Sequence, residues 1–251
     1  MNKNKYQLNY SDIAKDVYDF ELRINKAKKT ISILEDYLGS LKSFNLLDIG
    51  CSSGIMTNIY SDYFYKVTGI DIDSKAISFA LQNNNKKNIS FLICPIEENK
   101  FQGESFDVIT CSHIYEHIPD DEKLMEEIYR LLKPGGVCYF VAGNRFKIIE
   151  PHYSLPFLSF FPKNISNIYL RIFKKENYYY ENLKSYRNLV KLVKKFEIED
   201  YTLKVIKNPT FFYNNDLILE GSFRYYIFNS LAKLFYFAIP TYIWVLKKPI
   251  D

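Results

Sequence analysis

Two apolar runs of the sequence end in residues whose types can hold a ligand. The first run, residues 46–49, breaks into a turn of small residues bounded by Gly50 and Gly54. Small residues let the backbone approach a bound molecule closely, and a helix that starts after such a turn offers free N–H groups to a carboxylate or a phosphate. Turns of this kind also occur where only close packing is needed, so this one alone indicates a ligand weakly.

The second run, residues 67–72, contains Asp71, which follows Gly50 by 21 positions. In a doubly wound sheet the first two strands lie side by side, so an acid that closes the second strand can hydrogen-bond a ribose near the first turn. The glycines are spaced G-x-x-x-G with Asp48 two residues ahead of them, whereas the dinucleotide motif is G-x-G-x-x-G. Together the two segments favour a nucleoside ligand without a pyrophosphate.

With these residues the chain resembles the class I S-adenosylmethionine-dependent methyltransferases, whose first motif reads roughly D-x-G-x-G-x-G. Asp48, Gly50 and Gly54 match this motif, and Ser52 stands where the middle glycine is usual. The resemblance implies S-adenosylmethionine as the cofactor and methyl transfer as the activity.

The resemblance extends beyond the first motif. Residues 105–119 are similar to the fourth strand of the family and the loop after it, and residues 131–136 to the turn before the fifth strand. In all it covers about residues 44–143, in the order and spacing of the family.

The resemblance also implies cofactor contacts, position by position. Asp71 matches the acid that binds the ribose, and Ile72 a residue that flanks adenine. Many relatives place an Asp near adenine where this chain has Pro95. Either Glu97 compensates for it or the backbone of Ile96 reads adenine. The complete set of expected cofactor contacts is Asp48, Gly50, Cys51, Ser52, Gly54, Asp71, Ile72, Ile96, Ser112 and His113.

The pattern of the chain predicts an α/β fold. In residues 121–132 the apolar side chains share one helical face, acids fill the first turn, and Lys133-Pro134-Gly135 follows. Strands that alternate with such helices form a parallel sheet covered on both faces. We therefore expect the family's doubly wound, seven-stranded, mostly parallel Rossmann-like sheet with helical lid insertions. Strands are expected near residues 44–49, 66–71, 89–94, 106–111, 136–142, 198–206 and 240–246, and a helix at 183–194.

One methyltransferase domain is expected over residues 1–251. Its expected parts are N-terminal helices in residues 1–40, a cofactor-binding core in residues 44–143, and substrate or lid insertions in residues 145–182 and 210–238.

Composition excludes several classes of protein. The chain of 251 residues is 47% hydrophobic and 25% charged, which excludes a disordered protein. A net charge of +4 is too mild to imply nucleic acid as a partner. Four cysteines without a C-x-x-C pair favour reduced core thiols over a disulfide or metal framework. With a polar N-terminus that lacks a signal core, we expect a cytoplasmic protein.

The apolar run at residues 234–246 is too short for a membrane span. It has 13 residues and is interrupted by Pro240, whereas a spanning helix needs roughly 20 apolar residues. We expect the end of a helix followed by a buried strand.

Residues 145–180 exceed what the core fold needs. Ile165, Ile168 and Ile172 follow helical spacing, and basic residues outnumber acids. Such a lid packs over the core, holds a greasy substrate or lies on a membrane surface. Ubiquinone-biosynthesis O-methyltransferases are similar here, because an insertion linked to membrane contact follows an Asn-Arg pair like Asn144-Arg145. Residues 210–238 add a second aromatic-rich segment with the same interpretations.

Proton removal from a hydroxyl acceptor calls for a base, and three histidines are candidates. His152 opens the lid segment and is the expected catalytic base. His117 has either a structural or a catalytic role, and His113 is expected to border the sulfonium through its backbone. Arg23 either pairs with the methionine carboxylate or is an exposed helix residue. No spaced set of carboxylates and histidines predicts a metal site.

The sequence thus predicts S-adenosylmethionine-dependent methyl transfer, to an oxygen of a small-molecule or lipid-linked acceptor. Peripheral membrane contact is part of this hypothesis. One alternative is a nicotinamide-dependent oxidoreductase, which the missing third phosphate-loop glycine disfavours. The other is a binding protein that retains the fold without catalysis.

Overall fold

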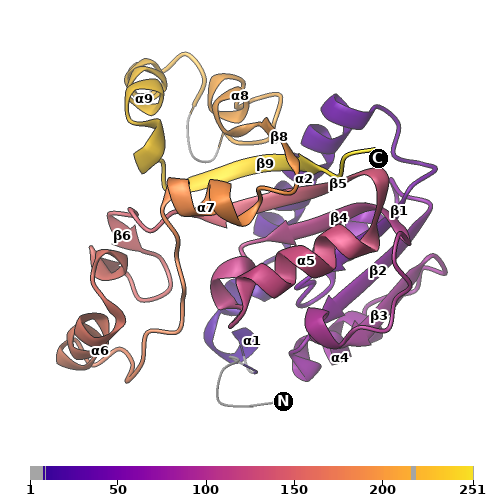
Figure 1. Ribbon diagram of the computed structural model, residues 1–251, viewed down its shortest axis with the longest axis horizontal. Coiled ribbons are helices and arrows are strands. Elements are labelled where there is room, and N and C mark those ends of the chain that lie inside the picture. The colour runs from indigo at the N-terminus through magenta and orange to yellow at the C-terminus, as the bar shows by residue number, and fades with distance from the viewer. Residues whose placement is uncertain (1–7, 9, 216–218, 251) are drawn as a thin grey trace.

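A seven-stranded sheet runs through the centre of the molecule in this computed structural model, which describes residues 8, 10–215 and 219–250 (Figure 1). The strand order is β3-β2-β1-β4-β5-β9-β8. The first five strands pair in parallel, and β9 pairs antiparallel with β5 and β8. This is the doubly wound, mostly parallel sheet expected from the sequence. The strands are β1 Asn45–Ile49, β2 Lys66–Asp71, β3 Ile89–Ile93, β4 Phe106–Ser112, β5 Leu132–Gly143, β8 Glu197–Asp200 and β9 Thr241–Lys247.

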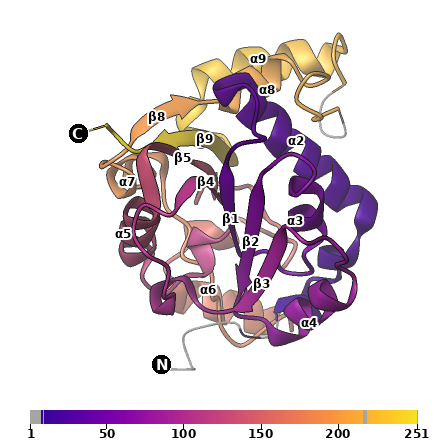
Figure 2. The same ribbon diagram turned by 90° about the vertical axis from the view of Figure 1, so that its right-hand side faces the viewer.

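Helices cover both faces of the sheet (Figure 2). Neighbouring residues of one strand point to opposite faces, so Val108 joins the core under α2, α3 and α8, and Ile109 joins the core under α5 and α7. The main helices are α2 Phe20–Leu38, α3 Ile55–Tyr60, α4 Ser74–Gln82, α5 Asp121–Leu131, α6 Lys163–Ile172, α7 Tyr186–Leu192, α8 Thr202–Lys207 and α9 Phe223–Leu234. Shorter elements are α1 Tyr10–Ile13, η2 Lys15–Tyr18, η3 Ile96–Glu98, η4 Tyr115–His117, η5 Leu158–Phe160 and η6 Tyr236–Ala238.

Helix α2 illustrates how the sequence sets these elements. Asp19 caps its first turn by accepting a hydrogen bond from the Leu22 N–H, and Gly39 ends it with a φ of 76°. Its buried residues Ala27, Ile31 and Leu34 follow helical spacing. The helix therefore buries one face against the sheet.

One predicted strand is partly wrong. Residues 198–206 were expected to be extended, but β8 ends at Asp200 and helix α8 follows. The Asp200 Oδ1 accepts a hydrogen bond from the Thr202 N–H at 2.8 Å, which starts a turn. Val205 and Ile206 are both buried in this helix, so the same apolar residues serve a helix. The helix predicted at residues 183–194 is present as the shorter α7.

The segment after β5 forms a lid beside the sheet. It contains a small hairpin of β6 Ile149–Glu150 and β7 Leu155–Pro156, followed by η5 and α6 (Figure 1). A small cluster of its own side chains, including Leu158 and Leu170, is fully buried and holds the lid together. Further along, α9 ends at Leu234 and β9 follows, as the sequence predicted for residues 234–246.

All four cysteines are free thiols, in agreement with the sequence. Across the described ranges we found no helix that is long and apolar enough to span a bilayer.

Candidate cofactor and acceptor site

A cavity of about 720 Å³ opens where β1, β2 and β4 end. Its lining comes from the loops after these strands, from the N-terminal segment and from the lid. Nine of the ten expected cofactor residues line it, as does His152. The exception is Gly54, which lies behind the loop, where an added Cβ would stand 2.6 Å from the Cβ of Ala80.

The glycine loop takes the backbone shape that the motif predicts. Gly50 has a φ of 71°, and an added Cβ there would lie 2.1 Å from Ile114 Cδ1. Ser52, in place of the usual glycine, also has a positive φ of 50°. A non-glycine residue in this region is strained, so the surrounding structure must hold it there. The loop therefore keeps the shape of the motif despite the substitution.

Asp71 lies at the end of β2 and supports this loop. Its Oδ2 accepts a hydrogen bond from the Ser52 N–H at 2.8 Å, and its Oδ1 accepts one from the Asp73 N–H at 2.9 Å. A carboxylate offers about four acceptor positions, so about two remain for a ribose. Asp73 instead caps α4, as predicted, by accepting from the Lys75 and Ala76 N–H groups.

Asp48 is buried in β1 and faces the cavity. Its carboxylate accepts hydrogen bonds from the Thr57 and Thr110 hydroxyls, each at 2.6 Å. Burial raises the pKa of Asp48 to about 6, although the two hydroxyl groups act to lower it. The charged form of this group therefore costs folding free energy.

Replacing Asp48 by asparagine is expected to raise the free energy of unfolding at pH 8 by about 1 to 2 kcal/mol. A pKa raised by about 2 means that the charged form of Asp48 costs about 3 kcal/mol of folding free energy, which the asparagine removes. One of the two threonine hydroxyls must then accept a hydrogen bond from the amide instead of donating one to a carboxylate, and this offsets part of the gain. The folded pKa is raised, so the stabilisation by the substitution is absent below about pH 4 and grows as the pH rises through 6. Urea unfolding of both proteins at pH 4 and pH 8 measures it. A variant that is less stable at pH 8 would contradict the expectation.

The expected adenine end of the cavity is lined by Cys94, Pro95 and Ile96. Ile96 is 2% exposed and lies at the start of η3, whereas Glu97 is not among the lining residues. Of the two alternatives from the sequence, this placement favours Ile96 over Glu97. Arg23 also lines the cavity and pairs with Asp16 at 3.7 Å, so it is not the freely exposed residue of the second interpretation.

His152, in the turn between β6 and β7 of the lid, lines the same cavity. Its Nδ1 lies 2.6 Å from Oε1 of the fully buried Glu150, whose Oε2 accepts a hydrogen bond from the Tyr153 N–H. Burial alone would lower the pKa of His152, but the hydrogen bond to Glu150 and the charge of Glu181 raise it above the usual value. The ring of Tyr10, from α1, packs against His152 at 6.3 Å between centroids.

His113 and His117 follow β4 on the same wall. The His113 Nδ1 lies 3.2 Å from Oε1 of the buried Glu116. Burial opposes the charge of Glu116, but the hydrogen bond and charge of His113 lower its pKa to about 2. Burial lowers the pKa of His117 to about 4, so this ring is neutral near pH 7. His113 has a φ of 57° and donates its N–H to the Val141 carbonyl, so it turns the chain at the end of β4.

Glu181 is a site residue that the sequence did not reveal. It lies between α6 and α7, 2% exposed, and lines the cavity beside His117 and His152. Burial raises the pKa of Glu181 to about 7. No motif surrounds it in the sequence, and only the path of the lid brings it to the histidines. Glu150 and Lys147 are further buried charges of this wall that no local pattern indicated.

A model of the methyltransferase domain matches residues 47–140. Among curated proteins, a ubiquinone biosynthesis O-methyltransferase of Coxiella burnetii is 32% identical over 108 residues, 42% of this chain and 46% of that protein. One from Bordetella avium is 31% identical over 134 residues, 50% and 56% of the two chains. The chain spans about half the length of the curated relatives it matches.

Solved structures share the fold. A chain of the complex between the Haloferax volcanii Trm112 methyltransferase activator and a putative methyltransferase has a TM-score of 0.59 at 15% identity, over 97% of this chain and 98% of that one. The YcgJ protein from Bacillus subtilis has a TM-score of 0.54 at 14% identity, over 88% and 98%.

The matched residues run from β1 to β5 and contain the loop, Asp71 and the strand that leads to His113. The chain therefore carries a match to a methyltransferase domain at residues 47–140, and about half of it is similar to the ubiquinone-biosynthesis O-methyltransferases.

Proposed function

We propose that the protein transfers the methyl group of S-adenosylmethionine to an oxygen of a small-molecule or lipid-linked acceptor. One observation carries this proposal: the glycine loop and the lid histidine line the same cavity. A cofactor on the loop and an acceptor under the lid would then share one enclosed space. The names of the curated O-methyltransferase relatives support oxygen as the acceptor atom.

The proposed cofactor contacts are the residues expected from the sequence. Asp71 binds the ribose through its remaining acceptor positions, the loop from Gly50 to Ser52 surrounds the methionine end, and Ile72 and Ile96 flank adenine. Arg23 is available to the methionine carboxylate at the cavity wall. The ribose, adenine and methionine-end roles come from the family resemblance, and all of these residues line the cavity.

For this reaction the protein mainly has to position the acceptor and remove its proton. The methyl group of a sulfonium is already activated, so the acceptor oxygen has to be held in line with the methyl–sulfur bond and lose its proton. We assign proton removal to His152. Glu150 holds its Nδ1 side, which fixes the ring and favours the protonated product form.

Calorimetric titration of the purified protein with S-adenosylmethionine, its demethylated product and NAD tests the cofactor. We expect the first two to bind and NAD to bind far more weakly, because the loop lacks the third glycine of the dinucleotide motif. Tighter binding of NAD would favour the oxidoreductase alternative and end this proposal.

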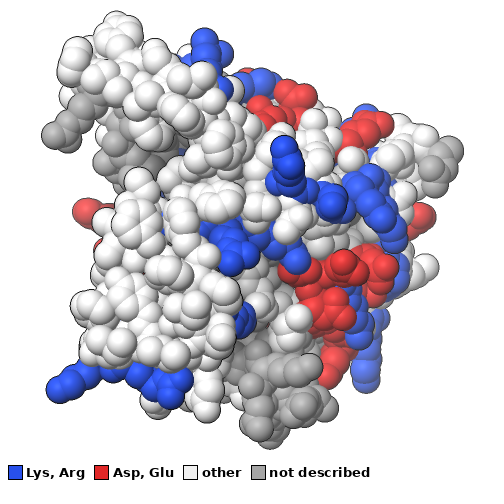
Figure 3. Space-filling model, turned by 60° about the vertical axis from the view of Figure 1, so that its left-hand side comes forward, with Lys and Arg blue, Asp and Glu red and all other residues white. Residues whose placement is uncertain are grey.

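The lid supports a lipid-linked acceptor or a membrane surface. Its exposed apolar side chains include Ile168 at 53%, Ile172 at 69% and Phe173 at 52% exposure. Figure 3 shows a broad surface on this side of the molecule with few charged residues, bordered below by basic ones. Exposed patches of this kind mark interaction sites, and basic residues at the edge suit an anionic lipid surface. We propose that this face contacts the membrane peripherally.

Flotation with anionic and neutral liposomes tests the lid, with an Ile168→Asp, Phe173→Asp double variant. Burial of apolar surface contributes about 25 cal/mol per Å² and each basic residue near an anionic surface about 1 kcal/mol, so the variant should bind anionic liposomes about tenfold more weakly or worse. Salt should weaken only the electrostatic share. The matched control is Leu81→Asp, Ile93→Asp, two similarly exposed residues of α4 and β3. Wild type that stays unbound to both liposomes would contradict membrane contact and leave methyl transfer standing.

A further inference from the structure

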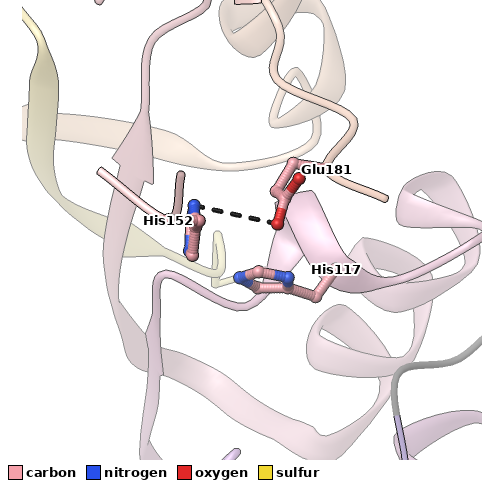
Figure 4. Close-up of side chains that lie close together, drawn as sticks. All are labelled: His117, His152 and Glu181. Atoms are coloured by element: carbon pink, nitrogen blue, oxygen red, sulfur yellow. Dashed lines mark ion pairs between the residues drawn. The ribbon is translucent and has the colours of Figure 1, made fainter. Parts of the chain in front are cut away.

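Three side chains from distant parts of the sequence meet at the lid wall of the cavity. His117 ends η4, His152 lies in the turn between β6 and β7, and Glu181 follows α6. Their ligand atoms all lie within 4.8 Å of one another (Figure 4). Two imidazoles and one carboxylate are a donor set that suits zinc and other divalent transition-metal ions.

Two buried atoms of this group lack a hydrogen-bond partner among the described residues. They are Oε2 of Glu181 and Nδ1 of His117. Buried polar atoms are almost always paired, and a buried carboxylate oxygen without a partner is costly. The nearest basic atom to Glu181 is Nδ1 of His152 at 3.8 Å, which is already held by Glu150 at 2.6 Å. One carboxylate oxygen and one ring nitrogen of this group are therefore available to a ligand.

We propose that His117, His152 and Glu181 bind a divalent transition-metal ion. Glu150 then serves as the outer carboxylate that orients a metal-binding imidazole, an arrangement common around such ions. Ligand atoms around a tetrahedral zinc lie about 3.3 Å apart, given bond lengths of about 2.0 to 2.1 Å. The three ligand atoms therefore need to approach one another by at most about 1.5 Å to hold the ion.

This inference rests on the proposed function and names an ion that would assist proton removal in the same site. Three protein ligands leave one position open, and all three residues line the cavity. An acceptor hydroxyl that occupies this position loses its proton more readily, because a bound cation stabilises the alkoxide or phenoxide. The O–H bond breaks, its proton leaves to water, and the oxygen takes the methyl group as the methyl–sulfur bond breaks. When no ion is bound, His152 itself accepts the proton of the acceptor hydroxyl. When the ion is bound, His152 is one of its ligands and does not act as the base.

Metal binding is measured without cofactor or acceptor, so that it is independent of methyl transfer. Protein freed of metal by a chelator is titrated with Zn²⁺ by calorimetry and with Co²⁺ by visible absorption, for wild type and a Glu181→Gln variant. Wild type is expected to bind one ion per chain, with a Co²⁺ spectrum of low coordination number. Glu181→Gln should bind at least tenfold more weakly, because an amide replaces the only carboxylate ligand.

The matched control is Glu122→Gln, an exposed residue of α5 outside the cavity lining, which should bind the ion like wild type. Circular dichroism of Glu181→Gln checks that it folds, and His152→Ala repeats the test at a second, less buried ligand. Equal Zn²⁺ affinity in wild type, Glu181→Gln and His152→Ala would overturn the proposed site, as would a wild type that binds no ion. Because S-adenosylmethionine binding is titrated separately, a protein that binds the cofactor and no metal would refute this inference alone.

Discussion

Replacing His152 by alanine is expected to lower the rate of methyl transfer by about 100-fold or more, with chelator present, while cofactor affinity stays near wild type. General bases contribute about 10²- to 10⁴-fold, and the ring lines the same cavity as the cofactor loop. Single-turnover rates and calorimetry separate the two effects.

The pH profile adds a second readout for His152. A base works in its unprotonated form, and the pKa of this ring is raised above the usual value of about 6.5 by Glu150. The wild-type rate should therefore rise with pH above 6.5, and the variant should lose this rise. Asn164→Ala, exposed at the start of α6 in the same lid, is the control and should behave like wild type. Wild-type turnover of His152→Ala across the pH range would end the assignment of the base.

Replacing Asp71 by alanine should weaken S-adenosylmethionine binding by about 1.5 to 3 kcal/mol, or roughly 10- to 150-fold. This is the range for hydrogen bonds to a charged group. The variant also removes the acceptor that holds the Ser52 N–H, so the strained loop loses a support. Calorimetric titration with the cofactor and with its demethylated product measures the change.

Glu97→Ala is the companion variant for Asp71, because Glu97 was the alternative adenine contact and is not part of the cavity lining. It should bind the cofactor like wild type. An unchanged dissociation constant in Asp71→Ala would remove this residue from the ribose site. A large loss of cofactor affinity in Glu97→Ala would instead support the alternative in which Glu97 contacts adenine.

The sequence predicts the cofactor side of this molecule well because its signals are local. A glycine loop between a strand and a helix, with an acid at the end of the next strand, needs only neighbouring strands to come together. β1 and β2 pair residue by residue from Asn45 to Ile49, which brings Asp71 within 2.8 Å of the loop. Even the Ser52 substitution leaves this arrangement intact.

The acceptor side could not be predicted in the same way. His152 is 35 positions after His117, and Glu181 is 29 positions after His152, so no short motif contains them. They meet because the turn between β6 and β7 and the segment after α6 both come close to η4, which follows β4. Similarly, residues 202–207 carry apolar side chains that suit a strand or a helix, and the turn at Asp200 decides for the helix. Both features depend on contacts between segments that are distant in sequence.

Methyl transfer itself is tested most directly by incubating the protein with S-adenosylmethionine carrying a labelled methyl group and with extracts of cells, separated into aqueous and lipid fractions. Mass spectrometry then looks for a compound that gains one labelled methyl group. We predict such a product with wild-type protein, and a strongly reduced yield with Asp71→Ala and His152→Ala. Cofactor binding without any labelled product in either fraction would contradict the account and favour a binding protein that retains the fold.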